Sequence, residues 1–220
     1  MPRNSHTLVQ GPEAAYLFGG ANEEGPRRDL LRLDLDTMRF SNVKIQDSPK
    51  VKLPALEMHT AHLYNQGKNL LVLGGRGIFP GQSLEEAAFH NEIYSIDLAT
   101  GDVELFGTLP ADLASHQSAL IDDQFLVMYG GTNGLRFFDS ILKYSLADKK
   151  WTLMTQQPKH CKSSRFFQDG RISASSVLCL PDLFVMFGGS SIDKECNDWL
   201  ILPIAHLKDD ANFAEINEIM

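Results

Sequence analysis

The sequence contains little cysteine. Its three cysteines, Cys161, Cys179 and Cys196, include no C-x-x-C pair. An odd number without that spacing provides neither a disulfide framework nor the usual ligands of a structural zinc site. We therefore expect free thiols that are buried or partly exposed.

The sequence also lacks a long apolar run and an excess of basic residues. No run approaches the roughly 18 apolar residues of a membrane span, and the N-terminal MPRNSHTLVQ has no apolar core of a secretory signal. The formal net charge is −8, whereas nucleic-acid binding depends on clustered Lys and Arg. We expect a globular protein of the cytoplasm, or of the nucleus, that binds neither membranes nor nucleic acid.

What the sequence does contain is a repeat. Four apolar runs, AAYLF, LLVL, FLVMY and LFVMF, each end in two adjacent glycines. The glycine pairs are Gly19-Gly20, Gly74-Gly75, Gly130-Gly131 and Gly188-Gly189, at intervals of 55, 56 and 58 residues. A second apolar strand follows each pair, as LLRLD, IYSID, ILKYS and WLILP. Four copies in register predict a repeat architecture built from strands.

The register extends to both ends of each copy. The segments SHTLV, MHTAHL, SHQSAL and SASSVL open the four copies at nearly constant distance from the glycines. Six residues beyond the second apolar strand stands Phe40, Val103 or Trp151, and in the fourth copy Phe213 follows after ten. We expect these late positions to lie in the last strand of their own copy.

This order of strands, glycine pair and late aromatic residue resembles the kelch repeat. The resemblance covers almost the whole chain, and the fourth copy departs most, with Ala174 where the others have His6, His59 and His116. It implies an all-β fold, namely a kelch-type β-propeller or partial propeller of four four-stranded antiparallel blades. It also implies a single domain, with blades at approximately residues 1–52, 53–109, 110–168 and 169–220.

The glycine pairs have a structural explanation. A propeller blade packs on neighbours through both faces, which explains apolar runs that are continuous rather than alternating. Glycine can adopt positive φ and leaves room for a neighbouring segment or ring, such as Tyr94 or Tyr144, to lie against the backbone. A phosphate-binding loop would need a following helix, and the sequence indicates none.

No residue set predicts catalysis, a cofactor site or a metal site. Ser5-His6 and Ser115-His116 are adjacent residues, and on a strand their side chains point to opposite faces. His59, His62 and His90 have no cysteine or carboxylate at the spacing of metal ligands. We expect no catalytic, cofactor-binding or metal-binding residues.

Two long connections are the candidates for partner binding. RGIFPGQSLEEAAFHNE (76–92) carries eight extra residues after its glycines, and TQQPKHCKSSRFFQDGR (155–171) links the third and fourth copies. Loop aromatic residues and arginines are typical interface anchors, although the same side chains could fold back on their own blades. The predicted partner-binding residues are Arg76, Phe79, Phe89, Arg165 and Phe166.

The resemblance implies a non-enzymatic module that presents loops to a protein partner. Two alternatives remain open, namely a kelch-fold enzyme acting on a sugar or small metabolite, and a structural subunit of a large assembly. Four blades also leave closure open between a small ring, an open arc covered by partners, and self-association. An open arc would expose two apolar blade faces, so we favour an arc capped by a partner or by a second copy.

Overall fold

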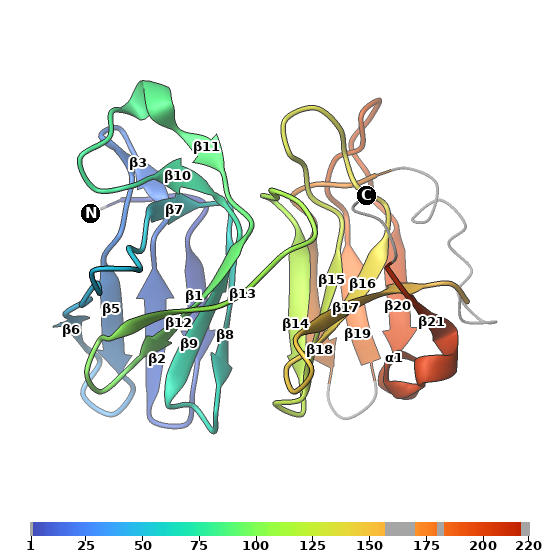
Figure 1. Cartoon of the computed structure of the whole chain (residues 1–220), viewed down its shortest axis with the longest axis horizontal. Coiled ribbons are helices and arrows are strands. Elements are labelled where there is room, and N and C mark those ends of the chain that lie inside the picture. Colours follow the sequence, from blue (N-terminus) through green and yellow to red (C-terminus); the bar gives the residue numbers. More distant parts are fainter. Residues whose placement is uncertain (1, 157–169, 180–182, 217–220) are drawn as a thin grey trace. The chain divides into compact units, whose positions relative to one another are not determined.

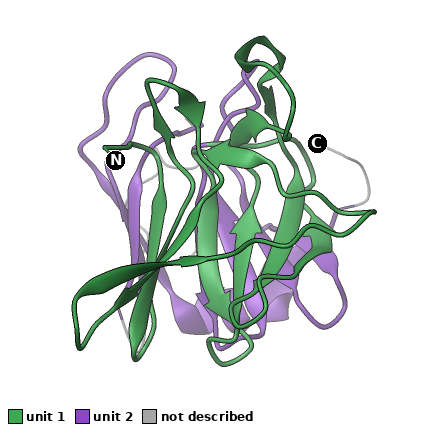
Figure 2. Ribbon diagram, turned by 90° about the vertical axis from the view of Figure 1, so that its left-hand side faces the viewer, with its two compact units in different colours: residues 1–114 green, residues 115–220 purple. Residues whose placement is uncertain are grey.

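The structure is a computed structural model that describes residues 2–156, 170–179 and 183–216. It is an all-β chain of small antiparallel sheets with one short α-helix among the described residues (Figure 1). The chain divides into two compact units, residues 1–114 and 115–220 (Figure 2). The two largest sheets of each unit are called blades 1 and 2 in unit 1 and blades 3 and 4 in unit 2.

Unit 1 contains two four-stranded antiparallel blades. Blade 1 consists of β1 (Thr7–Gln10), β2 (Ala14–Phe18), β5 (Leu30–Asp34) and β6 (Arg39–Val43). Blade 2 consists of β8 (Thr60–Tyr64), β9 (Asn69–Leu73), β12 (Glu92–Asp97) and β13 (Val103–Thr108). Phe18 and Leu30 of blade 1 share a buried core with Val72 and Tyr94 of blade 2, so the two blades pack face to face.

Small sheets lie beyond the glycine pairs of unit 1. They consist of β3 (Ala21–Asn22) with β4 (Gly25–Pro26), and of β7 (Ala55–Glu57), β10 (Arg76–Ile78) and β11 (Ala88–Phe89). A 3₁₀ turn, η1 (Leu84–Glu86), precedes β11. These elements cap one end of the blades in unit 1 (Figure 1).

Unit 2 repeats the arrangement with a different strand count. Blade 3 contains β14 (Gln117–Ile121), β15 (Phe125–Tyr129), β16 (Ile141–Ser145), β17 (Lys150–Met154) and, at its edge, β21 (Phe213–Glu215). Blade 4 has three strands among the described residues, β18 (Ser175–Cys179), β19 (Leu183–Phe187) and β20 (Trp199–Pro203). The strand content confirms the predicted all-β fold of antiparallel blades. Blades 1 and 2 have the four strands that were expected, whereas blades 3 and 4 have five and three among the described residues.

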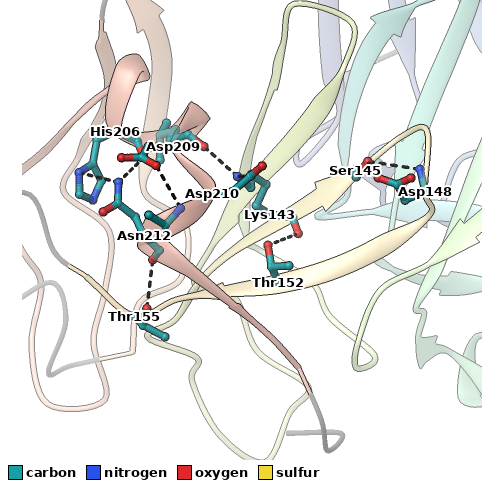
Figure 3. A network of polar contacts seen from close by, with 11 residues as sticks. Lys143, Ser145, Asp148, Thr152, Thr155, His206, Asp209, Asp210 and Asn212 are labelled. Atoms are coloured by element: carbon teal, nitrogen blue, oxygen red, sulfur yellow. Dashed lines mark hydrogen bonds and ion pairs between the residues drawn. The ribbon is translucent and has the colours of Figure 1, made fainter.

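The expected place of Phe213 in the fourth copy is wrong. Its strand, β21, pairs antiparallel with β17 of blade 3, with Phe213 opposite Met154. After β20 the chain turns through α1 (Ile204–Lys208) and η2 (Asp210–Asn212), which reverse it onto blade 3. The reversal is held by Asn212, whose carbonyl accepts from the Thr155 amide at 2.8 Å. The Thr155 hydroxyl donates to the same carbonyl at 3.3 Å (Figure 3).

A buried lysine explains why the chain returns to blade 3. Lys143 lies on β16 with its side chain largely buried, and its ammonium donates to the Leu207 carbonyl at 3.3 Å and to Asp210 at 2.5 Å (Figure 3). The ammonium also lies 4.1 Å from the centroid of the Phe213 ring. The C-terminal segment therefore supplies the partners that a buried ammonium requires.

Candidate functional site

The loops that follow the glycine pairs are the candidate binding loops, two in each unit. Each leaves the second strand of its blade, so in each unit the two loops emerge at the same end of the strands (Figure 1). The loop of blade 1 contains the β3–β4 hairpin, and that of blade 2 contains β10, η1 and β11. In unit 2, isolated bridges join Thr132 to Phe137 and Ser190 to Glu195. All four loops are therefore hairpin-like excursions on a sheet scaffold.

The glycine pairs set where these loops begin. All eight glycines have positive φ, between 55° and 104°. A Cβ at Gly19 would lie 2.4 Å from the Leu56 carbonyl oxygen and 2.8 Å from the His59 ring. The Gly20 amide donates to the same carbonyl at 2.8 Å. The first glycine pair is thus in contact with the Leu56 main chain and the His59 ring, which lead into blade 2. Only glycine, which has no Cβ, allows so close a contact.

The residue two positions before each opening strand also has a left-handed backbone conformation. Ser5, Met58, Ser115 and Ser173 have φ between 53° and 57°. The expectation that Ser5-His6 and Ser115-His116 lie on strands is therefore wrong, because β1 and β14 begin after these pairs. A turn at this position directs the chain from one blade to the next.

His59 shows what the repeated histidine does between blades. Its ring lies edge-to-face with Phe18 of blade 1 at a centroid distance of 5.2 Å, and its Nε2 lies 3.0 Å from the Thr7 hydroxyl. Burial, together with the nearby His6, lowers the pKa of His59 to about 3. The imidazole is therefore neutral at physiological pH and acts as part of the interface between blades 1 and 2.

The long loop of blade 2 is anchored by β10. This strand pairs with both β7 and β11, and a Cβ at Gly77 would overlap the Ala55 carbonyl. Arg76 binds Glu57 at 3.0 Å, with 40% of its own side chain still exposed. Arg76 stands opposite Phe89 in the β10–β11 pair, and both side chains are half-buried. The structure therefore brings two of the predicted binding residues together.

The remainder of this loop rests on its surroundings. The half-buried Phe79 ring lies edge-to-face with His90 at 5.3 Å. A hydrogen bond from His90 lowers the pKa of Glu92. Leu84 reaches the β3–β4 hairpin, because a Cβ at Gly25 would lie 2.3 Å from its side chain, yet 50% of Leu84 is exposed.

The loops of unit 2 carry the most exposed apolar side chains. Leu135 is 91% exposed and Ile192 is 75% exposed. The guanidinium of Arg136 lies 4.7 Å from the Phe138 ring centroid, which orients that loop. The predicted residues Arg165 and Phe166 lie outside the described residues, so their role stays a prediction.

The apolar loop tips Leu84, Leu135 and Ile192 were missed from the sequence. The sequence does carry a sign of their exposure. Each of the three residues lies among turn-forming residues after a glycine pair, in the segments GQSLEE, TNGLRF and SSIDKE. Apolar residues flanked by Asn, Gly, Ser and Asp have no strand in which to be buried, so their exposure could have been predicted.

The described residues offer no metal cluster. Within residues 2–156, 170–179 and 183–216, no three or more His, Cys, Asp or Glu side chains converge. The helices in the same ranges are all too short or too polar to cross a bilayer.

The comparisons with known proteins agree with this fold. The family model described as the KLHDC2/KLHL20/DRC7 Kelch-repeats domain matches residues 5–208. The chain therefore belongs to the kelch repeat family. Kelch repeats generally mediate protein–protein interaction and are generally non-enzymatic, and this match names no partner.

Three relatives illustrate how widely these repeats are used. Multiple epidermal growth factor-like domains protein 8 of Mus musculus is 28% identical over 91% of this chain and 7% of its own length. Kelch domain-containing protein 10 of Xenopus tropicalis is 29% identical over 62% of this chain and 33% of its own length. Leucine-zipper-like transcriptional regulator 1 of Homo sapiens is 26% identical over 93% and 24%. The chain thus spans a third or less of each of these relatives.

Proposed function

We propose that this protein is a non-enzymatic module of the cytoplasm that binds a protein partner through the loops that follow its glycine pairs. The observation that carries this proposal is the exposure of Leu84, Leu135 and Ile192 at the tips of these loops. Exposed apolar side chains on a rigid frame are what a protein interface uses as anchors.

Local hydrogen bonds preorganise the two tips in unit 2. The Asn133 side chain accepts from the Leu135 amide at 3.0 Å, and the Thr132 hydroxyl donates to the Arg136 carbonyl at 2.8 Å. In the next loop the Ser190 hydroxyl donates to Glu195 at 2.8 Å. A loop already held in one conformation loses less entropy on binding, which favours affinity.

In unit 1 the same role falls to Arg76, Phe79, Phe89 and Leu84. Arg76 retains exposed guanidinium surface beside Glu57, and Leu84 lies over the neighbouring hairpin. Phe79 and Phe89 are half-buried, so we assign them to holding the loop as well as to contacting a partner. The order of importance we propose is Leu84 and Arg76 first, then the two phenylalanines.

The test is affinity capture followed by mass spectrometry, with loop-tip variants compared on the partners that the native protein retains. Leu135→Glu and Ile192→Glu should lose a partner, with a loss of affinity of about tenfold or more for a true anchor. Met38→Glu is the matched control, because Met38 is 67% exposed at the turn between β5 and β6, away from the glycine-pair loops.

Melting temperature separates binding from folding in these variants. Because the tips are exposed, we expect melting temperatures within a few degrees of the native protein. Partners retained equally by the native protein and by Leu135→Glu, Ile192→Glu and Leu84→Glu would contradict the proposed role of these loops.

A further inference from the structure

Blade 4 has one buried face and one exposed face. Phe184, Met186, Leu200 and Leu202 share a buried core with blade 3. The alternate residues point the other way, and Trp199 is 55% exposed with its ring 4.4 Å from that of the exposed Phe187. Val177 and Ile201 are exposed on the same side. Among the described residues of unit 2, an apolar sheet face is therefore left exposed.

The strand register shows what such a face does elsewhere in this chain. Trp199 stands opposite Phe187 as Leu30 stands opposite Phe18 in blade 1. Leu30 and Phe18 are fully buried against blade 2. The exposed face of blade 4 therefore corresponds, residue by residue, to the face of blade 1 that packs on blade 2.

Blade 1 exposes the opposite, receiving face. Leu8 is 58% exposed and stands opposite Leu17. The equivalent pair in blade 2 is Ala61 and Val72, which lie in the core shared with blade 1. His6 of blade 1 is exposed as well. The equivalent of His6 in blade 2 is His59, which is buried against Phe18 and Thr7 of blade 1. In blade 4 the residues equivalent to Phe18 and Thr7 are Phe187 and Ser175.

The main-chain hydrogen bonds show the same complementarity. The second glycine of a pair donates to a carbonyl ahead of the next blade at three places, Gly20 to Leu56, Gly75 to Leu113 and Gly131 to Arg171, at 2.7 to 2.8 Å. In blade 4 the equivalent donor is the Gly189 amide. The equivalent acceptor before blade 1 is the Arg3 carbonyl, because Arg3 lies two residues before Ser5, as Leu56 lies two residues before Met58. Within the described ranges neither the Gly189 amide nor the Arg3 carbonyl makes a main-chain hydrogen bond.

Arg3 and Arg171 are equivalent in their side chains too. The Arg171 side chain donates to the Gly188 carbonyl at 3.1 Å and to Asp198 at 2.6 Å. Arg3 makes the same pair of contacts, with Gly19 at 2.9 Å and Asp29 at 2.8 Å. The Arg171 carbonyl accepts from the glycine pair of the preceding blade, so the Arg3 carbonyl is built to do the same.

Gly188, in the last glycine pair, has no described residue of another blade close to it. A Cβ at Gly130 would lie 2.3 Å from the Arg171 carbonyl oxygen, and one at Gly19 would lie 2.4 Å from that of Leu56. At Gly188 the nearest described atom is the Cys196 carbonyl oxygen, 3.4 Å away in the same blade. The space that the next blade occupies at the earlier pairs therefore contains no described residue at Gly188.

We propose that blade 4 of one copy of this chain packs on blade 1 of a second copy. Phe187 and Trp199 would lie against His6, Leu8 and Leu17, and the Gly189 amide would donate to the Arg3 carbonyl. The second copy is the occupant that the structure argues for, because this chain carries both halves of the contact with matched apolar positions and matched hydrogen-bonding groups. The contact is head-to-tail, so a pair of copies that makes it twice would cover both faces of each copy.

Sedimentation equilibrium of the full chain over a range of concentrations tests this contact. We expect a mass of at least twice the 24.5 kDa of the chain at high concentration. Trp199→Glu and Leu8→Glu should each weaken association at least tenfold, because each places a charge in an apolar interface. Met38→Glu, equally exposed but on neither face, should associate like the native protein.

Mixing the two variants distinguishes a head-to-tail contact from a symmetric one. The Leu8→Glu chain keeps an intact blade 4, and the Trp199→Glu chain keeps an intact blade 1, so their mixture should regain association that neither shows alone. Association that Trp199→Glu abolishes and Leu8→Glu leaves unchanged would indicate pairing of blade 4 with itself and would overturn the proposal. A native chain that stays monomeric at all concentrations would overturn it too.

Discussion

At the residue scale, the first glycine pair is required because main-chain atoms that precede the next blade lie close against it. Gly19 lies against the Leu56 carbonyl and the His59 ring, and Gly20 donates a hydrogen bond to that carbonyl. Positive φ alone would permit Asn or Asp at some of these positions. The close main-chain contact excludes any side chain, so at this junction the lack of a Cβ matters as much as the conformation.

A pair of alanine substitutions separates these two effects. Gly67 has φ +79° and nothing within 4 Å of a Cβ, whereas Gly19 has φ +63° and the Leu56 carbonyl at 2.4 Å. Gly67→Ala should cost only the left-handed strain, about 1 kcal/mol in the free energy of unfolding. Gly19→Ala should cost about 1–3 kcal/mol more, because blades 1 and 2 must move apart. Urea unfolding of both variants measures the difference, and equal losses would show that the contact adjusts freely.

At the element scale, β21 shows how one segment can serve a blade other than its own. The segment 204–215 leaves blade 4 after β20 and completes the edge of blade 3. Its arrangement follows from Lys143, whose ammonium meets Leu207, Asp210 and Phe213. The Asp210 carboxylate is 93% exposed, so that ion pair contributes little. The ammonium also lies 4.1 Å from the Phe213 ring centroid and 5.5 Å from that of Phe125.

Replacing that ring should release the strand. Phe213→Ala removes the cation–π contact and the apolar cover of Lys143, so β21 should separate from β17 while the rest of blade 3 stays folded. Hydrogen exchange should become faster in peptides covering 150–154 and 204–216, and stay unchanged in those covering β14. Phe40→Ala is the matched control, since Phe40 is the late aromatic of the first copy and is exposed on β6. Protection of 204–216 retained in Phe213→Ala would mean that backbone pairing alone holds β21.

At the scale of the whole molecule, the repeat register predicted the fold, because each glycine pair and each apolar run reports a local backbone requirement. The course of the chain after β20 could not be predicted in this way. Five residues of α1 are too few to show a helical period, and Phe213 joins blade 3 through a lysine 70 residues earlier. The spacing of ten residues instead of six was the one local sign of that departure.

The candidate site shows the same limit. The sequence identified the loop 76–92 by its length, and Arg76 and Phe89 do lie opposite each other on β10 and β11. The equivalence of Arg3 with Arg171 was not recognised, because the copies between them have Leu56 and Leu113 at that place. Only the hydrogen bonds of the folded chain show that these four residues hold the same position.

If copies associate through blades 4 and 1, the thermal stability of the protein depends on its concentration. A partner that binds only the folded chain raises its stability by about 2.7 kcal/mol at a hundred times the dissociation constant. For a chain of this size that corresponds to a rise of roughly 5–10 °C in melting temperature between dilute and concentrated samples. Scanning calorimetry of the native protein should show this rise. Over the same concentrations the rise should be much smaller for Trp199→Glu, because that substitution weakens the association. Met38→Glu should follow the native protein. Were Trp199→Glu to keep the full dependence on concentration, the stabilising contact would lie on a surface other than the exposed face of blade 4.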